Sequence, residues 1–91
     1  MSAYVVKRGS HDSEPFEPLK LHASILAACR TVRAFEGEAH NAAEHVCRDV
    51  IDWIEDKTEV TTDDIRRVAS SQLAAYHPEA SYMYEQHRMI I

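Results

Sequence analysis

The sequence has few glycines and few cysteines. Only two glycines occur among 91 residues, so the chain contains neither a glycine-rich dinucleotide-binding motif nor a P-loop. The two cysteines, Cys29 and Cys47, both lie within apolar, helix-like patterns, and we therefore expect reduced thiols in the core rather than a disulfide framework. No apolar run approaches about 18 residues, the length that a transmembrane helix needs.

The composition and the charge are those of an ordinary soluble domain. Hydrophobic residues make up 45% of the chain and charged residues 27%, proportions that argue against disorder. At 91 residues the chain is expected to form a single domain, residues 1–91. The 15 acidic and 10 basic residues give a net charge of −5, which opposes attraction to nucleic acid or to an anionic membrane. Because the N-terminus also lacks the pattern of a signal peptide, we expect a soluble cytoplasmic protein.

The N-terminal segment has the pattern of a short β-hairpin. Tyr4-Val5-Val6 is β-prone, Glu14-Pro15-Phe16-Glu17 is extended because a proline follows Glu14, and residues 9–13 between them are turn formers. A hairpin followed directly by a helix brings charged side chains of both signs together. Such a cluster suits a ligand that carries phosphates at one end and hydrogen-bond donors at the other. Its cations are Lys7, Arg8 and Lys20, and its carboxylates are Glu14 and Glu17.

Helices and a third short strand are predicted for the rest of the chain. Apolar residues at helical spacing predict a first helix, and Gly37 is expected to separate it from the second. Thr61-Thr62-Asp63-Asp64 offers a hydroxyl cap and acidic residues for a first turn, so a third helix is expected there. The order β-β-α-α-β-α-α predicts an α+β fold. The expected helices run from Leu19 to about Phe35, from about Glu38 or Asn41 to Asp56, from Thr62 onward and from Pro78 to Ile91, with the third strand within Lys57–Thr61.

No set of residues has the spacing of a catalytic or metal centre. His40 and His45 do not have the four-residue spacing at which one helix face would share a metal ion, so surface histidines are the better interpretation. Asp63 and Asp64 are expected to cap a helix rather than to act in catalysis. No serine or cysteine has a recognisable nucleophile context. We therefore expect neither enzymatic activity nor metal ligands.

Several short motifs follow one another along the chain. They are Val5-Val6-Lys7-Arg8-Gly9, Glu14-Pro15-Phe16-Glu17-x-x-Lys20-Leu21, Ser24-Ile25 with Ala28, Val60-Thr61-Thr62-x-x-Ile65, and Tyr82-x-Tyr84. In this order and spacing they resemble the ATP-cone family, from about Ala3 to Arg88. The resemblance implies a regulatory nucleotide-binding domain whose fold is a four-helix bundle capped by a small three-stranded β-sheet.

The resemblance also implies a ligand and the residues that bind it. ATP-cones are known in ribonucleotide reductase subunits and in the transcriptional repressor of reductase genes, where ATP and dATP compete for the site and change oligomeric state and activity. The expected ligand is ATP or dATP, with Mg²⁺ carried on the triphosphate. The implied nucleotide-binding residues are Lys7 and Arg8 toward the phosphates, Glu14 and Glu17 toward the adenine, Lys20 at the start of the first helix, Leu21 and Ile65 packed near the base, and Thr62 and Arg66 on the third helix.

Other interpretations stay open beside this one. The alternative function is a small helical protein–protein interaction module with a decayed nucleotide site, whose partner binding would not depend on nucleotide. Nucleic-acid binding through the arginine pairs Arg30/Arg33 or Arg66/Arg67 is disfavoured by the net negative charge. The partners implied by the resemblance are ribonucleotide reductase subunits or a second copy of the chain. A free-standing cone and a fragment of a larger regulated protein are both compatible with the sequence.

Overall fold

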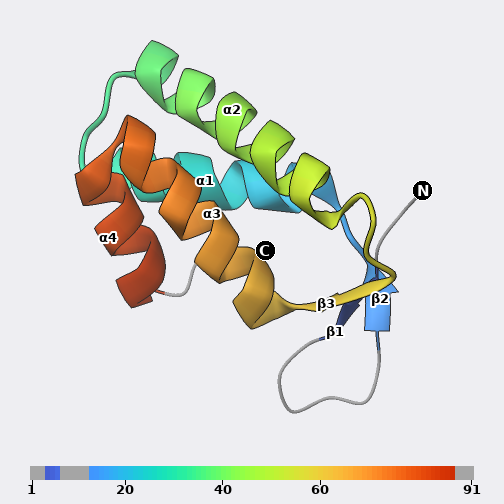
Figure 1. Ribbon diagram of the computed structural model, residues 1–91. Coiled ribbons are helices and arrows are strands. Elements are labelled where there is room, and N and C mark those ends of the chain that lie inside the picture. The colour runs from blue at the N-terminus through green and yellow to red at the C-terminus, as the bar shows by residue number, and fades with distance from the viewer. Residues whose placement is uncertain (1–3, 7–12, 88–91) are drawn as a thin grey trace.

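Across residues 4–6 and 13–87, which the computed structural model describes, the chain forms four helices and three short strands (Figure 1). Their order along the chain is the one that the sequence predicts. The strands lie together at one end of the helices. The elements are β1 (Tyr4–Val6), β2 (Ser13–Pro15), α1 (Pro18–Thr31), α2 (Glu36–Ile54), β3 (Glu59–Thr61), α3 (Thr62–Tyr76) and α4 (Pro78–His87).

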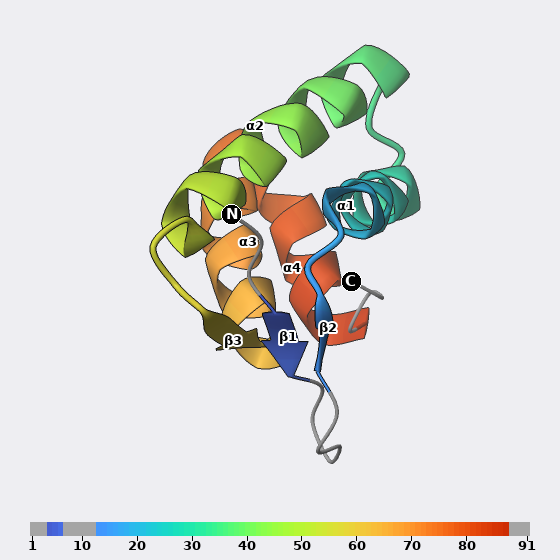
Figure 2. The same cartoon turned by 90° about the vertical axis from the view of Figure 1, so that its right-hand side faces the viewer.

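β1 is the middle strand of the sheet (Figure 2). It pairs antiparallel with β2, which sets Val5 opposite Glu14, and parallel with β3, which sets Val6 beside Thr61. The two strands of the predicted hairpin and the third strand near Val60 are therefore confirmed. Of the predicted turn, residues 9–12 lie outside the described residues, and Ser13 belongs to β2.

The junction between α1 and α2 differs from the prediction. Gly37, which the sequence places between the two helices, lies in the first turn of α2. The chain turns earlier, because Arg33 adopts a φ of 58° and the Ala34 N–H donates to the Cys29 carbonyl at 3.0 Å. This left-handed turn ends α1. A glycine in a helix costs only about 1 kcal/mol relative to alanine, so the packing of α2 outweighs it.

The starts of α3 and α4 are those that the sequence predicts. Thr61 Oγ1 accepts from the Asp64 N–H at 3.0 Å, and the Asp64 carboxylate accepts from the Thr61 N–H at 3.2 Å. This reciprocal pair is a capping box. α4 begins at Pro78, after His77, whose Nδ1 accepts from the Ala80 N–H at 3.3 Å. The description of this last helix ends at His87.

The core lies between the four helices. α1 packs against α2 and α4, and α3 packs against the same two helices. On α1, Leu21, Ile25 and Ala28 are fully buried, so these three apolar residues at helical spacing face the core. Cys29 and Cys47 are free and buried in the same core, as predicted, and burial raises the pKa of the Cys47 thiol to about 11.

The expected fold class requires a correction. The prediction was an α+β fold in which a three-stranded sheet caps a four-helix bundle. Instead the chain is mainly helical, and the strands have three residues each. Among the described helices, α3 makes the most extensive contact with the sheet. Among the strand residues whose side chains are described, Val60 alone is buried. Strands this short have too little apolar surface to cover a bundle, so the sheet extends from the start of α3 and does not form a cap.

Candidate functional site

Three separate parts of the chain meet at the sheet. β1 ends at Val6, beside Thr61 of β3 and opposite Ser13 of β2. β3 leads directly into α3, and β2 leads within a few residues into α1, so the starts of both helices adjoin the sheet (Figures 1 and 2). Of the predicted site residues, Lys7 and Arg8 follow β1 in the sequence and lie outside the described residues. Glu14 is placed by its backbone in β2, opposite Val5.

At the start of α1, Glu17 and Lys20 pair with each other. Lys20 Nζ lies 3.0 Å from Glu17 Oε2, and about half of each side chain is exposed. Glu17 is also the N-cap residue of α1, and its carbonyl accepts from the Lys20 N–H at 3.1 Å. Exposed ion pairs of this kind contribute at most about 1 kcal/mol. This pair alone therefore adds little to the stability of the domain.

Leu21 and Ile65 are placed inside the molecule. Both side chains are completely buried, with 0% of their surface exposed. They belong to the core cluster between the helices. These two residues therefore support the starts of α1 and α3 from within, and contact with a nucleotide base stays a prediction for both.

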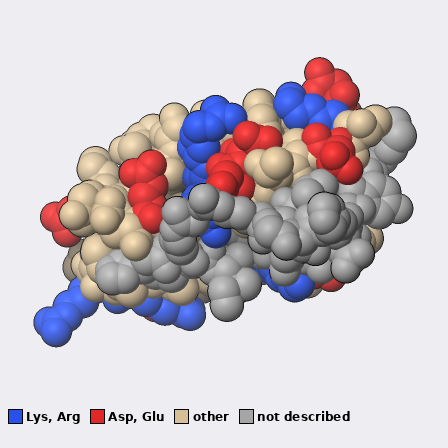
Figure 3. Space-filling model, turned by 90° about the horizontal axis from the view of Figure 1, so that it is seen from below, with Lys and Arg blue, Asp and Glu red and all other residues tan. Residues whose placement is uncertain are grey.

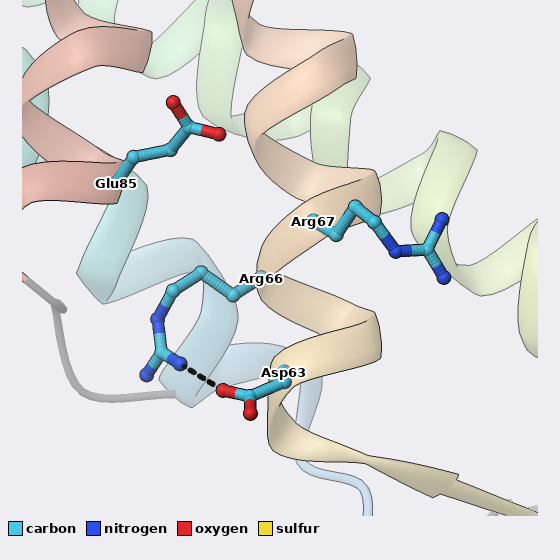
Figure 4. Close-up of a pocket in the computed structure, with 4 residues that line it drawn as sticks. All are labelled: Asp63, Arg66, Arg67 and Glu85. Atoms are coloured by element: carbon cyan, nitrogen blue, oxygen red, sulfur yellow. Dashed lines mark hydrogen bonds and ion pairs between the residues drawn. The ribbon is translucent and has the colours of Figure 1, made fainter.

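Within the part of the chain that the structure describes, two buried polar atoms at the start of α3 have no hydrogen-bond partner, Thr62 Oγ1 and Arg66 Nε. Arg66 lies one turn after Thr62, and 16% of its side chain is exposed. Its Nη1 donates to Asp63 Oδ1 at 3.0 Å, while Nε makes no such bond (Figure 4). A buried polar group without a partner costs about 1–3 kcal/mol, and folded proteins satisfy most such groups. These two atoms are therefore candidates for a hydrogen bond to a ligand at the start of α3.

A small pocket of about 200 Å³ lies beside these residues, between α3 and α4. Among the described residues it is lined by Asp63, Arg66 and Arg67 of α3 and by Glu85 of α4. Figure 4 shows Arg66 and Arg67 extending to different sides of α3. The volume is below the roughly 300–1,000 Å³ of a typical small-molecule site, so the pocket fits part of a ligand, such as a phosphate or a sugar.

Acidic and basic side chains alternate around the start of α3. Arg66 pairs with Asp63, and Arg67 pairs with Asp64 at 3.3 Å. Figure 3 shows the molecule from below, and on this face Lys and Arg side chains lie next to Asp and Glu side chains. The described part of this face is therefore not a continuous basic surface of the kind that duplex nucleic acid requires.

Asp63 and Glu85 lie at the site but are absent from the predicted set of ligand-binding residues. The sequence predicts that Asp63 and Asp64 both cap α3, yet the capping carboxylate is that of Asp64, whereas Asp63 pairs with Arg66. The spacing of Asp63 and Arg66 is a usable signal, because side chains three apart are neighbours on a helix. Glu85 gives no local signal, since only the packing of α4 on α3 brings it to the pocket.

Histidines of α1 and α2 lie close together on another part of the molecule. The ring centroids of His22 and His40 are 6.1 Å apart, and His40 Nε2 lies 3.5 Å from Glu36 Oε2. Across residues 4–6 and 13–87, however, no group of three or more His, Cys, Asp or Glu side chains is arranged to hold a metal ion. The same residues include no helix that is both long and apolar enough to cross a membrane.

The fold and the site define a small helical domain whose charged residues gather where a short sheet meets the starts of two helices. The family model described as the ATP cone domain matches residues 3–88, nearly the whole chain. The chain therefore belongs to the ATP-cone family, which confirms the resemblance seen in its motifs. Domains of this family are regulatory modules that bind ATP or dATP and are not catalytic. No curated protein and no solved structure matches the chain.

Proposed function

We propose that the domain binds ATP or dATP where β1, α1 and α3 meet, and that the bound nucleotide controls the oligomeric state or the activity of a partner or parent protein. The observation that carries this proposal is the parallel pairing of Val6 with Thr61. Lys7 and Arg8 come directly after Val6 in the sequence, and the first turn of α3 comes directly after Thr61. The pairing thus supports a site in which cations of one segment and a helix start of another act on the same phosphates.

The start of α3 supports phosphate binding in a second way. The first N–H groups of a helix and its dipole favour an anion. The unpaired Thr62 Oγ1 and Arg66 Nε are both able to bond to phosphate oxygens. Hydrogen bonds between a guanidinium and a phosphate are charge-assisted and contribute about 1.5–3 kcal/mol each. We therefore assign Thr62 and Arg66 to the phosphates, together with Lys7, Arg8 and the nearby Lys20.

Recognition of the base is assigned to the β2 side of the site. Glu14 sits in β2 opposite Val5, and Glu17 follows at the start of α1. A carboxylate accepts a hydrogen bond from the amino group of adenine, whereas guanine has a carbonyl oxygen at the equivalent position. We therefore propose that Glu14 and Glu17 select adenine over guanine, with Leu21 and Ile65 as the apolar support beneath the base.

The proposed role involves binding without chemistry. Mg²⁺ is proposed to arrive on the triphosphate, because magnesium needs few protein ligands when phosphates supply its oxygens. Steady ATP hydrolysis that depends on Lys7 would count against this role. The free, buried thiols of Cys29 and Cys47 support the reducing cytoplasm as the place of action. Ribonucleotide reductase subunits or a second copy of the chain are the proposed partners.

A second candidate function is nucleotide-independent binding of another protein. It is favoured by two large apolar side chains at the surface, Leu19 and Phe35, which are 85% and 83% exposed. Under this function, partner binding is the same with and without ATP, and Glu14→Gln has no effect. Nucleotide dependence therefore separates the two candidates.

The test is a calorimetric titration of the domain with ATP, dATP and GTP in the presence of Mg²⁺. We expect saturable binding of ATP and dATP and weaker binding of GTP. Arg66→Ala should weaken ATP binding about tenfold or more, the equivalent of one charge-assisted contact. Arg48→Ala is the matched control, because Arg48 is an arginine of α2 with 60% of its side chain exposed and is not among the described residues that line the pocket. A folded wild-type domain that binds no nucleotide contradicts the proposal.

The regulatory part of the proposal has its own measurement. Light scattering gives the molar mass of the domain without nucleotide, with ATP and with dATP. A mass that differs between the ATP and dATP samples supports control of self-association. The same mass in all three samples means that nucleotide does not control self-association. Control of a partner is then tested by mixing the domain with a ribonucleotide reductase subunit in the presence and absence of nucleotide.

A further inference from the structure

We infer that Asp63 restrains nucleotide binding by competing with the phosphates for Arg66. This inference rests on the proposed function. Asp63 lies in the first turn of α3, and its Oδ1 accepts from Arg66 Nη1 at 3.0 Å (Figure 4). The carboxylate of Asp63 therefore already bonds to one nitrogen of the guanidinium that the phosphates are proposed to bind.

The exposure of the two side chains favours competition over permanent pairing. The Asp63 side chain is 54% exposed, whereas the Arg66 side chain is 16% exposed. The Arg66 side chain is therefore the more enclosed of the two, and the carboxylate of Asp63 is the more accessible to water. The buried Nε of Arg66 has no partner, so the pair with Asp63 satisfies only part of the guanidinium. A phosphate that bonds to Arg66 meets the negative charge of Asp63 and displaces it.

The helix dipole gives Asp63 a second effect, which acts on the stability of the domain as well as on its affinity for an anion. A carboxylate in the first turn of a helix stabilises that helix, because the dipole is positive at this end. Asp63 therefore stabilises the nucleotide-free domain and neutralises part of the field that would attract a phosphate. Its removal is expected to lower stability and to raise affinity, whereas removal of a residue that merely positions Arg66 would lower both.

Glu85 supplies a control within the same pocket. Its carboxylate lies across the pocket on α4 (Figure 4), and the described residues record no ion pair between it and Arg66. Glu44 supplies a remote control, since its carboxylate makes an exposed pair with Arg48 on α2 at 3.6 Å. Asp63→Asn, Glu85→Gln and Glu44→Gln each remove one negative charge, so the effect of net charge on anion binding is common to all three.

The experiment is a calorimetric titration with Mg²⁺-ATP of the wild-type domain and of these three variants. We expect Asp63→Asn to bind about two- to fivefold more tightly than Glu44→Gln, the range that corresponds to losing one exposed ion pair. Glu85→Gln should fall between them. Thermal unfolding is measured in parallel, and the midpoint for Asp63→Asn should lie below that of the wild type.

A double-variant cycle isolates the contact with Arg66. In an Arg66→Ala background, the gain in ATP affinity of Asp63→Asn over Glu44→Gln should be smaller than in the wild-type background, and this difference measures the contact with Arg66. An equal gain in both backgrounds overturns the inference. Binding by Asp63→Asn that is equal to or weaker than binding by Glu44→Gln overturns the inference and makes Asp63 a positioning residue. If the wild type and every variant fail to bind ATP, the proposed function itself is overturned, and the inference with it.

Discussion

The Tyr84 hydroxyl lies 3.2 Å from Ser24 Oγ and joins α4 to α1 inside the core. The Ser24 hydroxyl donates to the Leu21 carbonyl at 2.7 Å, so Tyr84 is the donor in its contact with Ser24. Tyr84 is 0% exposed, and Ser24 is buried as well. Two successive hydrogen bonds shielded from water thus connect α4 with the first turn of α1, where Lys20 and Leu21 lie.

The order of these two bonds predicts unequal effects of two small substitutions. Ser24→Ala leaves the buried Tyr84 hydroxyl without a partner and should lower the free energy of unfolding by about 1–3 kcal/mol. Tyr84→Phe leaves Ser24 bonded to Leu21 and should cost less, about 0.5–1.5 kcal/mol. Urea unfolding of both variants is the measurement. Equal losses, or a larger loss for Tyr84→Phe, would show that the assigned direction of the bond is wrong.

Tyr84 also predicts a loss of stability at alkaline pH. Burial raises the pKa of Tyr84 from its ordinary 10.0 to about 12. The unfolded chain therefore releases this proton first as the pH rises, so the contribution of Tyr84 is complete below pH 10.0 and is lost progressively as the pH approaches about 12. The free energy of unfolding of the wild type and of Tyr84→Phe is measured across this range. The decline should be steeper in the wild type, and parallel curves would contradict the prediction.

The capping box of α3 predicts a loss of stability in acid. Hydrogen bonds from the Thr61 N–H and hydroxyl group, with a smaller effect of Arg67, lower the pKa of Asp64 below its ordinary 3.8. The contribution of Asp64 is therefore present above pH 3.8 and is lost as the pH falls through the folded-state pKa. Thr61→Ala should lower stability by about 1 kcal/mol at neutral pH. In thermal unfolding, the difference between wild type and Asp64→Ala should shrink below pH 3.8, and a constant difference would contradict this.

The end of α1 predicts a stabilising substitution. Arg33 has a φ of 58°, a left-handed conformation that costs a residue with a side chain about 1 kcal/mol and costs glycine little. Arg33→Gly should therefore raise the free energy of unfolding by up to about 1 kcal/mol. Ala27→Gly, at an exposed position within the same helix, is the matched control and should lower it by about 1 kcal/mol. Urea unfolding that shows both variants destabilised would refute the account of this turn.

The features of the fold that the sequence predicts correctly have local causes. The capping residues of α3, the proline that opens α4 and the β-prone run near Val60 each act on their own neighbours. Gly37 misleads because its small intrinsic cost is outweighed by the packing of α2. The predicted extent of the sheet is also too large. Strand propensity indicates where short strands form, but it does not indicate how much of the helical bundle three-residue strands can cover.

In the described part of the candidate site, too, features with local causes are predictable from the sequence and features set by helix packing are not. The predicted Lys20 and Arg66 each lie at a helix start beside the sheet, but each pairs with an acidic residue three positions earlier, Glu17 and Asp63. The three-residue spacing is a signal for both pairs, although neither pair is among the predictions made from the sequence. The proximity of Glu85 depends on the packing of α4 against α3, and no pattern within either helix predicts it.

The most direct test of the central claim is calorimetric titration of Lys7→Ala/Arg8→Ala with Mg²⁺-ATP and Mg²⁺-dATP. The matched control is Arg30→Ala/Arg48→Ala, which removes two exposed cations of α1 and α2 that pair with Glu36 and Glu44. The account predicts saturable binding by the wild type and the control, and a loss of about a hundredfold or more for the first variant. Wild-type binding that is equally strong in both double variants, or no binding by a folded wild type, would contradict it.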